Sequence, residues 1–136
     1  MLEPNSQNGN YSTRVLFIGY ENPHSFDQLQ YIGWPELGTP NTAKQTLQLV
    51  KEILEMLSQQ GTNSKILVHG SLGVGSTGTF IALLELLDSL DAKLSEFQQL
   101  ERFIPKQANS IIEEANLDIF NCVFNMRKQR CEMVRT

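Results

Sequence analysis

The sequence predicts a single α/β domain, and three observations point to this class. Two stretches near the N-terminus, residues 14–19 (RVLFIG) and 26–32 (FDQLQYI), have the composition or the apolar–polar alternation of strands. A segment with helical periodicity follows them. A short apolar stretch then leads through a glycine-rich loop into a second amphipathic helix. At 136 residues, the chain has room for one modest core.

The N-terminal region is expected to hold a frayed end and two strands. Residues 1–12 are polar and form the frayed end, so the folded domain extends over residues 13–136. The strands over residues 14–19 and 26–32 are joined by a loop, because the sequence ENPHS between them breaks the strand pattern.

A helix is predicted to begin at Asn41-Thr42 and to end near Gly61. Gln45 lies three residues after Thr42, which is typical of a helix start, and Gly61 favours a helix end. Apolar residues recur along this segment at steps of three and four, so they share one face. We expect that face to comprise Ala43, Leu47, Val50, Leu54 and Leu57.

The second half of the chain is expected to contain a buried strand at residues 65–68 (KILV) and two helices, at about residues 77–90 and 118–130. The stretch 92–116 has helical fragments interrupted at Pro105, and its structure is not predicted. The final helix has an apolar face formed by Ile119, Cys122, Val123 and Met126.

Composition and charge exclude several classes of function. The net charge is −4 and the isoelectric point is near 5.1, so nucleic acid is not an expected partner. The polar start MLEPNSQNGNYST is not a secretory signal, and the most apolar stretch, residues 80–90, is too short to span a bilayer. We therefore expect a soluble, cytoplasmic chain or the intracellular part of a longer protein.

The two cysteines, Cys122 and Cys131, have a spacing that matches neither a zinc site nor a disulfide framework. Reduced thiols are therefore expected, with Cys122 in the core on the apolar face of its helix. Neither a metal nor another cofactor is expected.

The glycine-rich loop, residues 69–80 (HGSLGVGSTGTF), lies between the predicted strand and the N-terminus of the next helix. This position directs backbone N–H groups into one concavity, which suits an anion such as phosphate. The loop would fit the nucleoside-triphosphate motif GxxxxGK[ST] if Ser76 were lysine. It also fits GxGxxG, but the acidic candidates Asp88 and Asp91 fall in or just after the following helix, where a dinucleotide site has no use for them.

As a whole, the loop resembles the signature loop of the protein tyrosine phosphatases, HCSAGVGRTGTF. Residues 33–40 (GWPELGTP) resemble the mobile acid loop of that family, WPDxGxP, and residues 118–136 are similar to its helix DIFxxVxxxRxQRxxMVQT. The resemblance implies a partial phosphatase-like fold, with a mixed central sheet flanked by helices. It covers only the C-terminal half of the family's domain, which predicts instability, self-association or a covering partner.

The resemblance also implies which residues form the site. The acid loop comprises Trp34, Pro35 and Glu36. The phosphate-binding loop comprises Ser71, Leu72, Gly73, Val74, Gly75, Ser76 and Thr77.

Several departures from the family pattern affect the chemistry. Gly70 replaces the nucleophilic cysteine, and Ser76 replaces the arginine that clamps the phosphoryl oxygens. Leu72 replaces an alanine. Glu36 keeps the carboxyl of the general acid but is one methylene longer than aspartate, and Arg135 stands where the family has the first glutamine of its last motif.

No other residue is expected to act as the nucleophile. A C(x)5R loop needs arginine six residues after its cysteine, but Lys128 follows Cys122 at that distance, and the sequence ends before that position after Cys131. Both cysteines also belong to the final helix rather than to a loop before a helix. We therefore expect the chain to be catalytically inactive.

Two classes of function remain open. One is a binding module that holds phosphotyrosine or a related anion weakly at residues 70–77, with a phosphotyrosyl protein as its partner. The other is an interaction or structural protein with an idle pocket, one that works through its surface or pairs with a full-length phosphatase. Residual hydrolysis by Glu36 and water alone is a third, remote alternative.

Several site residues also have a structural explanation. His69 is expected to be a hydrogen-bonded structural residue, because there is no thiolate for it to stabilise. Trp34 and Pro35 are expected to anchor their loop by packing, unless that loop still closes.

The remaining candidates are glycines and arginines. Glycine is expected at three positions because the backbone turns sharply there and packs close to the helix: Gly73, Gly75 and Gly78. Arg127 and Arg130 are expected to complement the helix dipole and to pair with carboxylates, with an acidic partner as the alternative.

Overall fold

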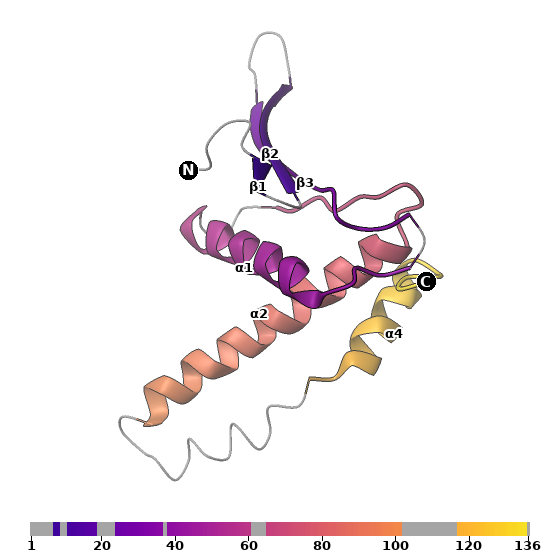
Figure 1. The fold of residues 1–136 in the computed structure, drawn as a ribbon. Coiled ribbons are helices and arrows are strands. Elements are labelled where there is room, and N and C mark those ends of the chain that lie inside the picture. Colours follow the sequence, from indigo (N-terminus) through magenta and orange to yellow (C-terminus); the bar gives the residue numbers. More distant parts are fainter. Residues whose placement is uncertain are drawn as a thin grey trace. The chain divides into compact units, whose positions relative to one another are not determined.

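The computed structural model describes residues 7–8, 11–18, 24–36, 38–60, 65–101 and 117–135 (Figure 1). The chain divides into two compact units, Met1–Gln45 and Thr46–Thr136. Strands and helices both occur, so the predicted α/β class is confirmed. Among the residues described, no helix is long and apolar enough to cross a membrane.

The first unit contains a three-stranded antiparallel sheet in the order β1-β2-β3. β2 (Tyr11–Ile18) and β3 (His24–Tyr31) pair along their whole length, and β1 (Gln7–Asn8) adds a short edge. The β-branched and aromatic residues of these segments favour a pleated backbone. Both predicted strands are therefore confirmed with shifted bounds, although residues 7–8 and 11–12 lie in the sheet and were expected to be frayed.

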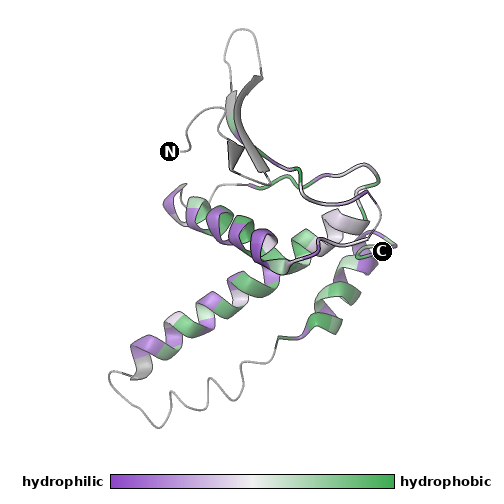
Figure 2. Cartoon of the chain, in the orientation of Figure 1, coloured by the Kyte–Doolittle hydropathy of each residue, from purple (hydrophilic) through white to green (hydrophobic). Residues whose placement is uncertain are grey.

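α1 (Ala43–Gln60) begins and ends where the sequence predicts. Hydrophobic and hydrophilic residues alternate along it, as a helix with one buried face requires (Figure 2). The predicted face is partly wrong, because Ala43 is exposed and Leu47 is 40% exposed. Val50, a member of the predicted face, is buried as expected, and the helix turns Thr46 and Leu49 inward beside it.

Residues 65–68 do not form the predicted buried strand. Leu67 is 87% exposed and Ile66 is 42% exposed. A strand is stable only when a neighbouring strand satisfies its N–H and C=O groups, and this stretch pairs with none of the strands described. The described strands all pair antiparallel, so the parallel pairing of a mixed sheet is not found among them.

α2 (Gly75–Glu101) is longer than the helix predicted over residues 77–90. It continues because residues 91–101 (DAKLSEFQQLE) are mostly good helix formers and include neither glycine nor proline. The first part of the unpredicted stretch 92–116 thus belongs to α2, and residues 102–116 lie outside the described residues. Near its start α2 is well packed, with Thr77 and Ala82 buried.

α4 (Ile119–Gln129) confirms the predicted final helix. Asp118 caps it, because its carboxylate accepts a hydrogen bond from the N–H of Asn121 at 2.9 Å. The expected core face is wrong for Ile119, which is 60% exposed. Its other members are half-buried: Cys122, Val123 and Met126.

Candidate functional site

The acid loop follows β3 in the first unit, and Trp34 anchors it. The half-buried indole packs edge-on against Tyr31, with ring centroids 6.1 Å apart, and its Nε1 donates to the carbonyl oxygen of Gly38 at 3.1 Å. Gly38 has a φ of +104°, which favours glycine. This arrangement matches the predicted packing role of Trp34. Pro35 is exposed, so the packing role predicted for it is wrong, and Glu36 is exposed as well.

The phosphate loop belongs to the second unit, so the structure places it in a different unit from Glu36. The loop runs directly into α2, which begins at Gly75. The first N–H groups of a helix have no acceptor within it, and they carry the positive end of the helix dipole. The predicted position of the loop before a helix N-terminus is therefore confirmed.

The side chains of the loop are mostly exposed. Ser71 and Ser76 face solvent, and Leu72 is 80% exposed. His69 is exposed too, and the hydrogen bond predicted for it is not formed among the described residues. Thr77, by contrast, is buried at 6% exposure.

Gly70, which the motif resemblance predicts to stand at the nucleophile position, faces two hydroxyl groups. A Cβ atom on Gly70 would lie 3.0 Å from Thr77 Oγ1 and 3.3 Å from Ser76 Oγ. The structure thus brings together the two altered positions, 70 and 76. The groups nearest to Gly70 are thus two hydroxyls, which are neutral hydrogen-bonding groups.

Residues 130–135, which follow α4 and are called the C-terminal segment below, hold the loop in place. Val134 N–H donates to the carbonyl oxygen of Val74 at 2.9 Å, and Arg130 donates to the carbonyl oxygen of Leu72 at 3.0 Å. These bonds explain why the end of α4 lies beside the start of α2 in Figure 1. The loop conformation therefore depends on residues almost sixty positions further along the chain.

Arg127 supports the same segment from α4. Its Nε donates to the carbonyl oxygen of Met133 at 2.8 Å, and a terminal nitrogen reaches the carbonyl oxygen of Val134 at 3.5 Å. The prediction that Arg127 and Arg130 pair with carboxylates is therefore wrong, because both bind main-chain carbonyls instead. Their position in the last turn of α4 or just after it is as predicted.

The glycines of the loop allow this close approach. A Cβ on Gly78 would lie 2.5 Å from the nitrogen of Val134, and a Cβ on Gly75 would lie 2.7 Å from the oxygen of Arg135. Both positions therefore exclude any larger residue unless the segment moves. Gly73 has a φ of +66°, so the predicted sharp turn is confirmed there.

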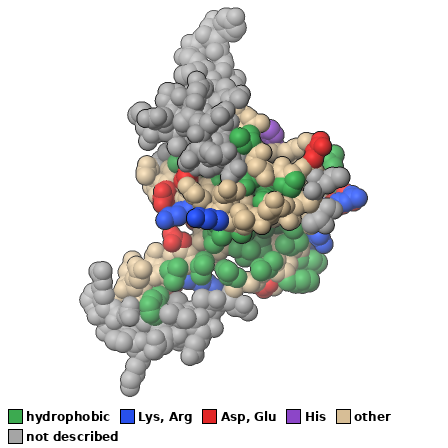
Figure 3. Space-filling view, in the orientation of Figure 1, with side chains coloured by type: hydrophobic (Ala, Val, Ile, Leu, Met, Phe, Trp, Pro, Cys, Tyr) green, Lys and Arg blue, Asp and Glu red, His purple; other side chains and the backbone are tan. Residues whose placement is uncertain are grey.

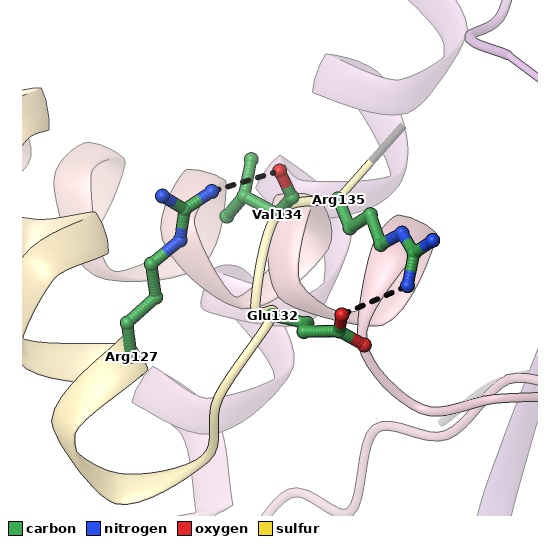
Figure 4. Close-up of a pocket in the computed structure, with 4 residues that line it drawn as sticks. All are labelled: Arg127, Glu132, Val134 and Arg135. Atoms are coloured by element: carbon green, nitrogen blue, oxygen red, sulfur yellow. Dashed lines mark hydrogen bonds and ion pairs between the residues drawn. The ribbon is translucent and has the colours of Figure 1, made fainter.

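A pocket of about 470 Å³ lies at the C-terminal segment, not at the phosphate loop (Figure 4). Its lining residues are Arg127, Glu132, Val134 and Arg135. Arg135 pairs with Glu132 at 2.9 Å, and both side chains are largely exposed. Glu132 and Val134 have φ values of 64° and 61°, a conformation that costs about 1–3 kcal/mol for a residue other than glycine.

Cys122 has the properties of a structural thiol. Burial, together with the nearby charges of Glu85 and Asp118, raises the pKa of its thiol. A reactive cysteine needs the opposite shift, because the thiolate is the nucleophile. This supports the exclusion of Cys122 as a substitute nucleophile.

Sequence reasoning missed the contacts between the loop and the C-terminal segment. The bonds from Arg130 to Leu72 and from Val134 to Val74 join parts of the chain that no local periodicity connects. The only signal available was that both parts matched motifs of the same family.

Comparison with known proteins identifies the family to which this chain is similar. The family model described as protein-tyrosine phosphatase matches residues 2–136. Human receptor-type tyrosine-protein phosphatase epsilon is 35% identical over 109 residues, which are 80% of this chain and 12% of that protein. Chicken receptor-type tyrosine-protein phosphatase eta is 33% identical over 113 residues, 83% of this chain and 6% of the relative. The chain thus spans a small part of these relatives.

Solved structures agree with these matches. The catalytic domain of human protein tyrosine phosphatase non-receptor type 18 aligns with a TM-score of 0.67 and 27% identity, covering 99% of this chain and 42% of that one. A Trypanosoma brucei protein tyrosine phosphatase aligns with a TM-score of 0.69 and 27% identity, covering 98% of this chain and 41% of that one. The fold is accordingly a partial phosphatase fold. The chain belongs to the protein-tyrosine phosphatase family.

Proposed function

We propose that this chain is a catalytically inactive phosphatase-like domain that binds a phosphotyrosyl group or a similar anion weakly at residues 70–77. The observation that carries the proposal is the surroundings of Gly70, where the neighbouring side-chain groups are the hydroxyls of Ser76 and Thr77, and neither a thiol nor a guanidinium is among them. Covalent attack on phosphorus needs a nucleophile at this point. Hydrogen bonding to an anion does not need one.

The groups available for binding are main-chain N–H groups and exposed hydroxyls. The start of α2 supplies N–H groups and the positive end of a dipole, and Ser71 and Ser76 supply hydroxyls. Losing a charge-assisted arginine contact removes about 1.5–3 kcal/mol, or roughly one to two orders of magnitude in affinity. Binding is therefore weak and depends on the main chain.

Arg135 would supply part of the missing charge if its pair with Glu132 were broken. Its carbonyl oxygen lies close to Gly75, so the residue adjoins the loop, and its exposed guanidinium is held by Glu132 at 2.9 Å. A guanidinium released from that pair would add a positive charge beside the anion site. Glu132→Gln should therefore strengthen phosphopeptide binding. Glu85→Gln, which removes an exposed carboxylate from α2, is the matched control.

The test is an amide NMR titration of the chain with a phosphotyrosyl peptide and with its unphosphorylated twin. We expect amides of residues 71–77 to shift only with the phosphopeptide. Ser76→Arg should then tighten binding by roughly 10- to 100-fold. If these amides stay unmoved by the phosphopeptide at millimolar concentration, the binding proposal fails.

Inactivity has its own test. We expect no turnover of a generic aryl phosphate above the background without enzyme. Turnover that disappears in Glu36→Gln would contradict inactivity and would support residual hydrolysis by that carboxyl.

A second candidate function is an interaction protein with an idle pocket, one that pairs with a full-length phosphatase. The large hydrophobic residues left exposed on α4 favour it. In either case the proposed location is the cytoplasm or the intracellular part of a longer protein.

A further inference from the structure

The C-terminal segment contains two residues in the left-handed backbone conformation. Glu132 has a φ of 64° and Val134 has a φ of 61°. This conformation is costly for residues with a Cβ atom, and most of all for a β-branched residue such as valine. It persists only where surrounding contacts fix it. The contacts of Val134 therefore hold the segment against its own backbone preference.

Two hydrogen bonds fix Val134, one on each side of its Cα atom. Its N–H donates to the carbonyl oxygen of Val74 at 2.9 Å, and its own carbonyl oxygen accepts from Arg127 at 3.5 Å. Arg127 also donates to the carbonyl oxygen of Met133 at 2.8 Å, and the Met133 side chain is buried. Without these contacts Val134 would return to an extended or right-handed backbone. The docked segment and a released segment are therefore two distinct conformations.

The two helices beside the segment have contacts that do not depend on it. Arg130 ends α4, and its N–H donates to the carbonyl oxygen of Met126 at 2.9 Å. α2 and α4 contact each other, and Figure 3 shows hydrophobic side chains gathered over the part of this unit where they lie. The pair between Glu132 and Arg135 lies within the segment and connects it to neither helix. Residues 131–135 can therefore leave while both helices stay in place.

We infer that residues 131–135 form a strained clip, which opens without unfolding of α2 or α4 and then leaves the phosphate loop without support. Relief of the strain favours the open clip, whereas the bonds to Val134 and Met133 favour the closed one. The closed clip lies directly on the loop, because a Cβ atom on Gly75 or Gly78 would lie 2.7 Å or 2.5 Å from its main chain. Control of the anion site by the clip rests on the proposed function, but the clip itself is tested without a ligand.

Amide hydrogen exchange of the 136-residue chain, measured at several urea concentrations below the unfolding transition, tests the inference. The N–H of Val134 should exchange through opening of the clip, which exposes little surface, so its rate should hardly depend on urea. The N–H of Ala82, a buried residue of α2, should exchange more slowly, at a rate that rises with urea. A Val134 N–H that follows Ala82 in rate and urea dependence overturns the inference, because the clip would then open only with the helix. A Val134 N–H without protection overturns it as well, because the clip would then not be closed.

Two variants of Glu132 separate the strain from the loss of its ion pair. Glu132→Asn and Glu132→Gln both remove the exposed carboxylate that pairs with Arg135. Asparagine adopts the left-handed conformation more readily than glutamine, so Glu132→Asn should favour the closed clip. We expect the Val134 N–H to exchange at least about threefold more slowly in Glu132→Asn than in Glu132→Gln. Equal rates, or a faster rate in Glu132→Asn, would overturn the role of strain in opening the clip.

Discussion

The N–H of Val134 donates a hydrogen bond to the carbonyl oxygen of Val74 at 2.9 Å, and this bond ties the C-terminal segment to the phosphate loop. Val74 is also the acceptor for Gly78 N–H at 3.2 Å, so one carbonyl serves both the first turn of α2 and the docked segment. Loop, helix start and C-terminal segment therefore form one connected unit.

Gly78→Ala should destabilise this unit. The new Cβ would lie 2.5 Å from the nitrogen of Val134, so the segment or the helix must shift. Overpacking of this kind costs about 1–3 kcal/mol, and urea unfolding would measure it. Ser76→Ala, at an exposed position in the same turn, is the control and should cost far less. Equal stability of the two variants would contradict the close contact.

Arg130→Met should loosen the loop. It removes the bond to the carbonyl oxygen of Leu72 and the guanidinium that lies against Gly73, and an exposed bond of this kind contributes about 1 kcal/mol. Hydrogen exchange should therefore speed up in residues 70–76. Lys128→Met also removes a cation near the end of α4, but its ammonium lies over Phe124, so the loop should exchange as in the parent chain.

Cys122 should react slowly with an alkylating agent. Burial and the charges of Glu85 and Asp118 raise the pKa of its thiol, so less thiolate is present at neutral pH than for an ordinary cysteine. In the Cys131→Ser variant, mass spectrometry should show a rate below that of a cysteine-containing peptide, rising at higher pH. A rate above that of the peptide at neutral pH would show an activated thiol.

Asp118 should make stability depend on acid pH. Hydrogen bonds from the main chain and side chain of Asn121 lower the pKa of its carboxyl in the folded state. Its contribution is therefore present above the unfolded pKa, about 4, and is lost as the pH falls through the lower folded pKa. Thermal unfolding of the parent chain and of Asp118→Ala should differ at pH 6 and converge toward pH 2. A difference that stays constant would exclude this mechanism.

Local patterns predicted α1, the start of α4 and the loop before α2 correctly, because caps and periodicity act within a few residues. They failed at residues 65–68, since an apolar stretch becomes a strand only when a neighbour pairs with it. The end of α2 was missed because residues 91–101 lack a clear apolar face but favour helix by composition. The hydrogen bonds from Arg127 and Arg130 to main-chain carbonyls were not predicted, because they depend on how the chain folds around the end of α4 and not on local periodicity.

The close contacts at Gly75 and Gly78 show that some positions of the signature loop are fixed by packing, and these differ from the positions fixed by catalysis. Glycine is needed at these positions because the C-terminal segment packs against the loop. This packing requirement holds whether or not the protein catalyses any reaction at phosphorus. In the motif that this loop resembles, the nucleophile and the phosphate clamp stand at positions 70 and 76. A sequence search weighted toward the glycines of this motif will collect members with and without a nucleophile, whereas one weighted toward those two positions will sort them.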